Sequence, residues 1–278
     1  MAYDSILVHL DSNPQARQRL EVAGRLAAAS QCRLIGMYAG FIPDPAWFYL
    51  MDGAQQYVAD DLARRKQIRE DVRAQFLAAT QAMQVRAEWR AAELGAVASV
   101  LREAREAGLV VAGQYDPGNT EGPVARQLLE SLLLETGRPT LVVPCTGTFP
   151  TLGTRVIVAW NGSREAARAL HDALPLMAGA QARILCAQTA AKEARADATP
   201  VGHAARVLER HGVAVEIEHG PGGADLTIGE LILSRAADFN ADLIVMGAYG
   251  HGRMRELVLG GVTHTLLDSM TAPVLFSR

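Results

Sequence analysis

The chain contains one structural plan twice, and this repeat limits its fold more than any other feature of the sequence. Each half opens with a short apolar run, a turn and an amphipathic stretch: residues 5–10, 11–14 and 16–30, then residues 155–160, 161–163 and 164–178. Asp11 and Asn161 are 150 residues apart, and so are Arg33 and Arg183. Self-similarity at a constant spacing indicates duplication of one α/β unit.

The ends of the two halves repeat as well. Residues 109–115 align with residues 243–249, and residues 138–143 align with residues 272–277, in both cases at a spacing of 134 residues. These segments are nearly continuous apolar runs, as expected for parallel strands that are buried on both faces.

Strand-like runs that alternate with helical patterns predict a parallel sheet covered by helices. We therefore expect two tandem doubly wound α/β domains, each with a five-stranded, mostly parallel sheet and helices on both faces. The boundary falls where Pro150 and neighbouring glycines interrupt the pattern, which gives domains at residues 1–148 and 153–278. The two halves are expected to pair through their last strands, at Leu141–Val143 and Val274–Phe276. Whether two chains then form a homodimer stays open.

Composition narrows the class of protein. A net charge of −3 gives no reason to expect a nucleic-acid or anionic-membrane partner, and no apolar run reaches the roughly 18–20 residues of a membrane span. The N-terminal residues enter a strand at once, so we expect no signal peptide. An odd, scattered set of cysteines (Cys32, Cys145 and Cys186) fits a reducing cytoplasm better than a disulfide scaffold.

A glycine-rich segment between the apolar run 242–246 and a helical pattern starting at Val262 is the strongest functional signal. It contains Gly247, Gly250, Gly252, Gly260 and Gly261. Missing Cβ atoms let main chain approach a ligand, and a helix that begins there offers unpaired N–H groups to an anion such as phosphate. The spacing matches neither of the standard phosphate-binding fingerprints. The alternative, in which these glycines only make turns and cap a helix, stays open.

With this motif in place, the chain resembles the universal stress protein family in its tandem two-domain form. Gly247-x2-Gly250-x9-Gly260 matches the Gly-x2-Gly-x9-Gly-Ser/Thr pattern of the ATP-binding members, and Val262 and Thr263 match the usual continuation. Gly261 departs from the pattern, because it stands where the family has Ser or Thr.

The resemblance implies that the C-terminal half binds ATP, with Mg²⁺ carried by the nucleotide. Asn161 stands where the family tends to have Asp, and it keeps an acceptor oxygen but loses the charge. No catalytic residue and no metal ligand is assigned. The implied ATP-binding residues are Ala159, Trp160, Asn161, Ala187, Met246, Gly247, Gly250, His251, Gly260, Gly261, Val262 and Thr263.

The first half lacks this motif. Asp116, Arg126, Gln127 and Leu129 occupy the positions of Gly250, Gly260, Gly261 and Thr263. Negative charge and bulky side chains at these positions disfavour phosphate binding, so we expect a single nucleotide site per chain. The alternative that Arg126 itself reaches an anion stays open.

Three functions remain in competition. The first is a cytoplasmic stress-response protein that binds an adenine nucleotide and acts as a sensor or regulator. The second is an interaction module without a nucleotide, in which both halves serve assembly. Trp47-Phe48-Tyr49 is a separate candidate for a partner or ligand surface, and the alternative that it only packs its own loop down stays open. The third is a weak ATP hydrolase or a phosphoryl or nucleotidyl transferase, which is less favoured because the sequence offers no clear catalytic base and no P-loop lysine. Two smaller expectations are that Ser163 caps a helix and that His9 is a core or subunit-facing residue.

Overall fold

The structure is a computed structural model that describes residues 2–39, 54–92, 96–116, 122–187, 200–220, 226–248 and 260–278. Both halves follow the predicted alternation of strands and helices. The strands of the first half are β1 (Ser5–Leu10), β2 (Arg33–Ala39), β3 (Ala87–Ala92), β4 (Leu109–Gly113) and β5 (Thr140–Val143), and its helices are α1 (Ala16–Ser30), α2 (Ala54–Ala82), α3 (Ala96–Ala104) and α4 (Gly122–Glu135). The strands of the second half are β6 (Arg155–Ala159), β7 (Gln181–Ala187), β8 (Ala214–Gly220), β9 (Leu243–Gly247) and β10 (Val274–Ser277), and its helices are α5 (Arg164–Ala173), α6 (Val201–Arg210), α7 (Ile228–Asp238) and α8 (Gly261–Ser269).

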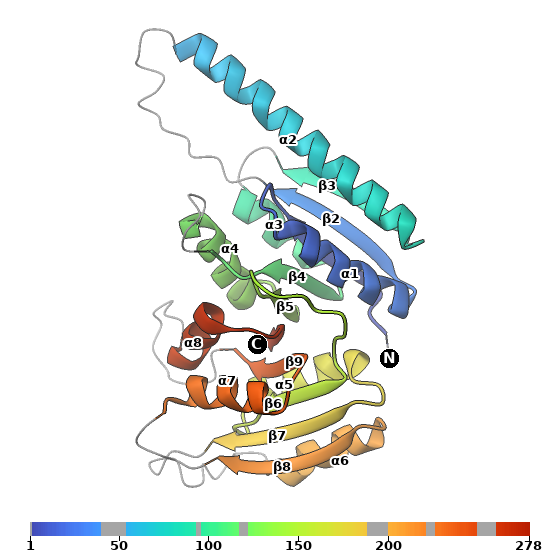
Figure 1. The fold of residues 1–278 in the computed structure, drawn as a ribbon, viewed down its shortest axis with the longest axis vertical. Coiled ribbons are helices and arrows are strands. Elements are labelled where there is room, and N and C mark those ends of the chain that lie inside the picture. The colour runs from blue at the N-terminus through green and yellow to red at the C-terminus, as the bar shows by residue number, and fades with distance from the viewer. Residues whose placement is uncertain are drawn as a thin grey trace.

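All of these strands lie in one ten-stranded sheet with the order β3-β2-β1-β4-β5-β10-β9-β6-β7-β8. Figure 1 shows the sheet running from β3 to β8, with the two halves meeting in the middle. Within each half all strand pairs are parallel. The prediction of two five-stranded, doubly wound α/β units is confirmed.

The two halves are joined by the antiparallel pair β5–β10. Val142 lies opposite Val274, and Leu141 lies opposite Leu275. Every residue of both strands is buried. The predicted pairing through the last strand of each half is therefore confirmed within one chain.

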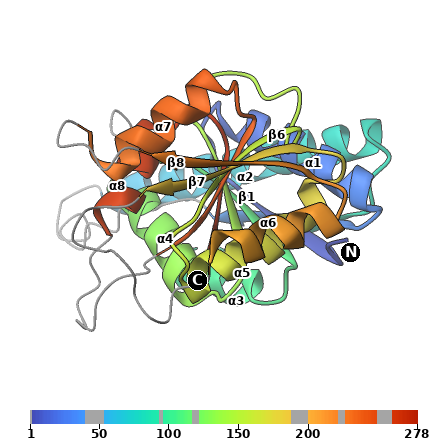
Figure 2. The same cartoon turned by 90° about the horizontal axis from the view of Figure 1, so that it is seen from below.

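Each face of the sheet has its own hydrophobic core. One core gathers side chains from α1, α2, α5 and α6, with Leu20, Phe76, Leu170 and Leu208 among them. The other gathers side chains from α3, α4, α7 and α8. Figure 2 shows this for the second half, where α7 covers one face and α5 and α6 cover the other. Burial on both faces explains why inner strands such as β1, β4, β6 and β9 are nearly continuous apolar runs, whereas the edge strands β3 and β8 are only partly buried.

One helix is shorter than its sequence pattern suggests. The pattern predicts a helix over residues 164–178, but α5 ends at Ala173 and is followed by a 3-10 turn at Leu174–Leu176. Pro175 lies inside this turn and has no N–H group to continue the α-helical hydrogen bonds. By contrast, the predicted helix over residues 16–30 is confirmed.

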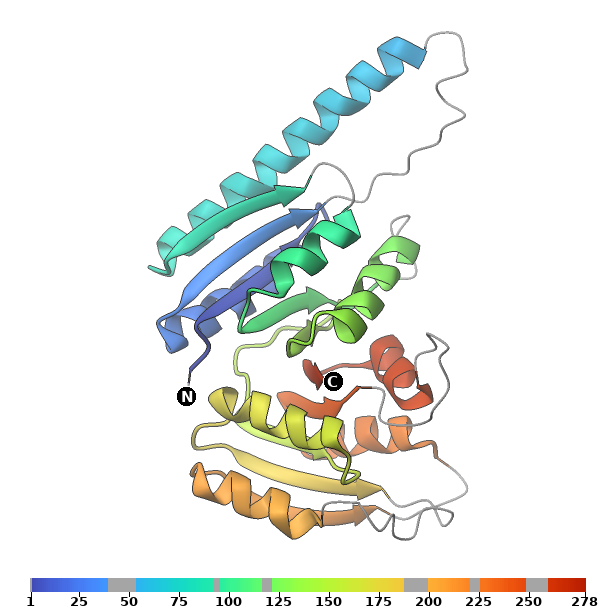
Figure 3. The same cartoon turned by 180° about the vertical axis from the view of Figure 1, so that it is seen from behind.

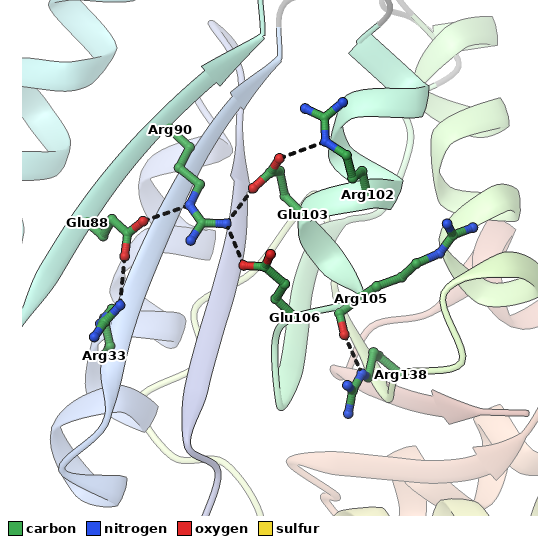
Figure 4. Close-up of polar contacts among 8 residues, drawn as sticks. All are labelled: Arg33, Glu88, Arg90, Arg102, Glu103, Arg105, Glu106 and Arg138. Atoms are coloured by element: carbon green, nitrogen blue, oxygen red, sulfur yellow. Dashed lines mark hydrogen bonds and ion pairs between the residues drawn. The ribbon is translucent and has the colours of Figure 1, made fainter.

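Arg33 and Arg183, which the repeat relates, both hold an edge strand to its neighbour. Arg33 pairs with Glu88 at 2.9 Å, and Arg183 pairs with Glu218 at 3.3 Å. Figure 4 shows that Arg90 joins the first pair to α3, because it contacts Glu88, Glu103 and Glu106. Charges on edge strands also disfavour pairing with a strand of another protein.

Within the described part of the chain, no helix has both the length and the apolar character that a membrane span requires.

Candidate functional site

The carboxyl ends of three strands of the second half lie at the same edge of the sheet. Ala159, the last residue of β6, lies opposite Leu185 of β7 and Met246 of β9. β6 is flanked by β7 and β9, so the chain winds away from it in both directions. Ligands of open α/β sheets bind at such a switch point, beyond the carboxyl ends of the strands.

The turn after β6 is built by side chains. Asn161 Oδ1 accepts a hydrogen bond from the main-chain N–H of Ser163 at 3.1 Å, and Ser163 Oγ accepts one from the N–H of Ala166 at 3.2 Å. The predicted capping role of Ser163 is confirmed. Trp160 is buried, whereas Asn161 is exposed. The amide oxygen of Asn161 therefore already takes part in the local turn.

Gly247, at the end of β9, is required by packing. A Cβ atom there would lie 2.6 Å from both the main-chain nitrogen of Ala166 and the carbonyl carbon of Glu165. The first turn of α5 thus packs directly against β9, and no ligand is needed to explain this glycine.

Gly260 and Gly261, at the beginning of α8, are different. Gly260 is the N-cap with φ −59°, which any residue adopts, and no side chain caps the helix. A Cβ atom added at either glycine would have no described atom within 4 Å. The first intrahelical bond runs from His264 N–H to Gly260 O at 3.1 Å. Neither backbone strain nor packing among the described residues requires glycine here.

The remaining predicted residues fall into three groups. Thr263 is only 3 % exposed and Met246 is buried, whereas Val262 is half-buried. Ala187 is the last residue of β7. Gly250 and His251 lie outside the described residues, as do Trp47-Phe48-Tyr49. Figure 3 shows α8 at the edge of the sheet toward which β7 and β8 point.

Glu165 was not singled out from the sequence. It is a buried carboxylate in the first turn of α5, against the end of β9. Burial alone would raise the pKa of Glu165, but the adjacent Arg164 guanidinium and local hydrogen bonds hold that pKa below its usual value. An acidic residue two positions after a capping serine was the available signal, and it also fits a residue that only stabilises the helix start.

The same place in the first half is filled by charged side chains. Asp11, after β1, accepts a hydrogen bond from Arg19 Nη2 at 2.7 Å, and Asp11 and Arg19 are 3 % and 5 % exposed. His9 is also buried, and its Nδ1 lies 4.0 Å from Asp11 Oδ2. The core alternative for His9 is therefore the correct one. A cavity of only about 30 Å³ remains between these residues and α4.

The helix that corresponds to α8 also begins elsewhere. By the spacing of 134 residues, α4 would start at Gln127, but it starts at Gly122. Arg126 and Gln127 therefore lie beyond the first turn, where main-chain N–H groups bond within the helix. Arg126 itself pairs with Glu130 at 2.8 Å and stacks over the Tyr115 ring. These contacts support the expectation of one site per chain.

The fold and the ends of the strands define a class of protein, a duplicated α/β protein. Its two switch points differ, because the protein's own side chains fill the one in the first half. Residues 154–278 match the model of the Universal stress protein family. The match covers the C-terminal half of the chain, so that half resembles a domain of this family.

Individual proteins are also similar to this chain. Universal stress protein Slr1230 of Synechocystis sp. is 32% identical over 152 residues, which are 54% of this chain and 50% of that protein. The chain thus spans about half the length of this curated relative. A universal stress protein of Archaeoglobus fulgidus has the same fold, with a TM-score of 0.70 at 19% identity, over 99% of this chain and 96% of that one. A functionally unknown protein of Pseudomonas aeruginosa has a TM-score of 0.60 at 18% identity, over 99% and 92% of the two chains.

Gly247 and Gly260 should respond differently to replacement by alanine. Gly247→Ala should reduce the free energy of unfolding by more than about 2 kcal/mol, because the new methyl group collides with the α5 main chain. Gly260→Ala, its matched control, should change that free energy by less than about 1 kcal/mol. Urea unfolding of both variants measures this difference. Equal losses would show that the two glycines have the same structural role.

Burial of His9 predicts a loss of stability in mild acid. The pKa of His9 is lowered from 6.5 to about 4, chiefly by burial and in smaller part by Arg19, while Asp11 and the Ala39 carbonyl act in the opposite direction. The unfolded chain takes up this proton at a higher pH than the folded chain does. The free energy of unfolding should therefore fall by on the order of 2–3 kcal/mol as pH drops from about 6.5 towards 4.

The measurement is urea unfolding at several pH values in this window. His9→Gln should flatten the dependence, while replacing the exposed His203 by Gln should leave it as in the unaltered protein. An identical pH profile for the His9 variant would contradict the neutral, buried state of this imidazole.

Proposed function

We propose that the C-terminal half binds one adenine nucleotide, ATP with its Mg²⁺, and that the protein acts in the cytoplasm as a stress-response sensor or regulator. The observation that carries this proposal is the beginning of α8. There, two consecutive glycines begin the helix, although neither φ nor packing among the described residues requires glycine at these positions.

The chemistry of this opening suits a phosphate group. The first residues of an α-helix have N–H groups without intrahelical partners, and the helix dipole adds positive potential at the same point. Small or absent side chains at Gly260 and Gly261 would let phosphate oxygens reach these N–H groups directly. Family members that bind ATP carry the same Gly-x2-Gly-x9-Gly spacing, and this agreement further supports the proposal.

The base and ribose would then lie across the ends of β6 and β7. Trp160, Asn161 and Ala187 are the proposed contacts, beside the close-packed start of α5. A divalent ion would be held by the nucleotide's own phosphates. Within the described residues, no group of three or more His, Cys, Asp and Glu side chains is placed to hold a metal ion.

A regulatory role is favoured over turnover. The described strand ends bring one buried carboxylate, Glu165, to the start of α5, and this carboxylate is bonded to Arg164. A general base needs hydrogen-bond access to the proton that it removes, and no residue is assigned that task here. Nucleotide occupancy, rather than catalysis, is therefore the proposed signal.

Calorimetric titration of the full chain with Mg²⁺ and ATP, or with a non-hydrolysable analogue, tests the proposal. We expect one site per chain. Gly260→Asp would place a carboxylate against the phosphate and remove one hydrogen bond between a main-chain N–H group and a charged phosphate oxygen. This should weaken binding by about 10- to 150-fold. Gly260→Asn is the matched control for bulk without charge and should weaken binding less. Asp116→Ala, in the first half, should bind as the unaltered chain does.

Other results would redirect the interpretation. If no adenine nucleotide binds at millimolar concentration, the non-nucleotide interaction module replaces this proposal. Steady-state phosphate release above about 1 per second, abolished by one substitution, would instead indicate an enzyme.

A further inference from the structure

Arg19 is the side chain that most clearly separates the two halves. Along α1 and α5, residues 150 positions apart face the sheet in the same way: Ala16 and Ala166 are both buried, and so are Leu20 and Leu170. By this alignment Arg19 stands where the second half has Ala169, which is fully buried. One half therefore has a guanidinium group where the other has a methyl group.

The guanidinium group of Arg19 lies at the switch point of the first half. It bonds Asp11 after β1, and it passes so close to Gly113 at the end of β4 that a Cβ atom there would collide with it. In the second half the corresponding Gly247 faces the α5 main chain instead. Arg19 thus fills the space between the ends of β1 and β4, where a ligand of a doubly wound sheet would bind.

The space that Arg19 leaves is too small for an organic ligand. The remaining cavity of about 30 Å³ has room for about two water molecules, whereas ligand pockets usually measure about 300–1,000 Å³. Arg19 lines this cavity, and its Nε is a buried donor that has no hydrogen-bond partner among the described residues. Such a donor marks a polar site that the protein's own atoms do not satisfy completely.

We propose that Arg19 is a built-in occupant of the first half's ligand site, a guanidinium cation held by Asp11 that restricts ligand binding to the second half. Asp11 and Arg19 thus close the ligand site of the first half and leave ligand binding to the second half. Asp11 is buried beside this cation, while its counterpart Asn161 is exposed and uncharged. The restriction to the second half rests on the proposed nucleotide site, but the presence of a guanidinium-binding cavity does not.

The cavity is tested without any nucleotide. Arg19→Ala should leave Asp11 buried without its cation and create a space of guanidinium shape, so free guanidinium ion should take that place. In about 50 mM guanidinium chloride, far below denaturing concentrations, the melting temperature of this variant should rise by about 2–4 °C relative to sodium chloride at equal ionic strength.

Two proteins serve as controls in this experiment. The unaltered chain still holds its own guanidinium, and Asp11→Asn/Arg19→Ala lacks the carboxylate that would bind the ion. Neither should gain stability from guanidinium. An Arg19→Ala variant that responds no more than these two proteins would overturn the proposal.

The proposed restriction of ligand binding to the second half is tested by moving the Asp11 and Arg19 pair to that half. Asn161→Asp/Ala169→Arg places the carboxylate and the cation at the second switch point. The matched control is Asn161→Asp/Ala167→Arg, which has the same composition but carries the arginine at a half-buried position that corresponds to the exposed Arg17. The affinity of the first double variant for Mg²⁺ and ATP should be at least tenfold weaker than that of this control. Equal affinities of the two double variants would overturn the proposed division. If the unaltered chain binds no nucleotide, the proposed function fails by itself, and the guanidinium experiment still decides whether Arg19 fills a ligand site.

Discussion

The structure depends on the antiparallel pairing of β5 with β10. Both strands are short and fully buried, so either half alone would end in an unpaired apolar strand edge. Their pairing satisfies that edge within one chain and makes the two cores continuous through a ten-stranded sheet. It also brings α8 beside the first half, where Gln114 Nε2 donates to Leu267 O at 2.8 Å and Tyr115 bonds Asp268. The helix that opens the proposed phosphate site is therefore anchored at its far end by the other half.

This arrangement lets the two halves differ without loss of the fold. The strands need only bury both faces and keep their register, and both halves do so with similar apolar runs. The switch points are free to diverge: a buried ion pair fills the space in the first half, whereas the second half has Ala169 at the position of Arg19 and Asn161 at the position of Asp11. Such a pair is a weak source of stability by comparison with apolar packing. Its presence at Asp11 and Arg19 is better explained by its position than by its contribution to folding.

The fold was largely predictable from the sequence. Repeated apolar runs at constant spacing predicted the strands and the mostly parallel sheet of each half, and the duplication predicted that the halves pair through Leu141–Val143 and Val274–Phe276. These features depend on local pattern, which sequence records directly. The end of α5 was missed because the apolar pattern continues through Pro175, although the helix does not.

The site was predictable only in part, because close contacts between distant segments decide it. Gly247 is part of the glycine motif, but glycine is required there because the α5 main chain, about 80 residues earlier in the sequence, packs directly against it. Arg19 looked like one of several charged residues on an amphipathic helix, and only the folded chain shows it buried against Gly113. The early start of α4 at Gly122 likewise shows why Arg126 lies inside a helix instead of at its opening.

The most direct test of the account is a nuclear magnetic resonance titration that follows the main-chain amides of the isotope-labelled full chain. If phosphate is held by the open start of α8, saturating ATP with Mg²⁺ should shift the amide signals of Gly261, Val262 and Thr263 strongly, and those of Arg126, Gln127 and Leu128 should stay in place. Unchanged signals at the start of α8, in a sample that calorimetry shows to be saturated, would contradict the account and place the nucleotide elsewhere.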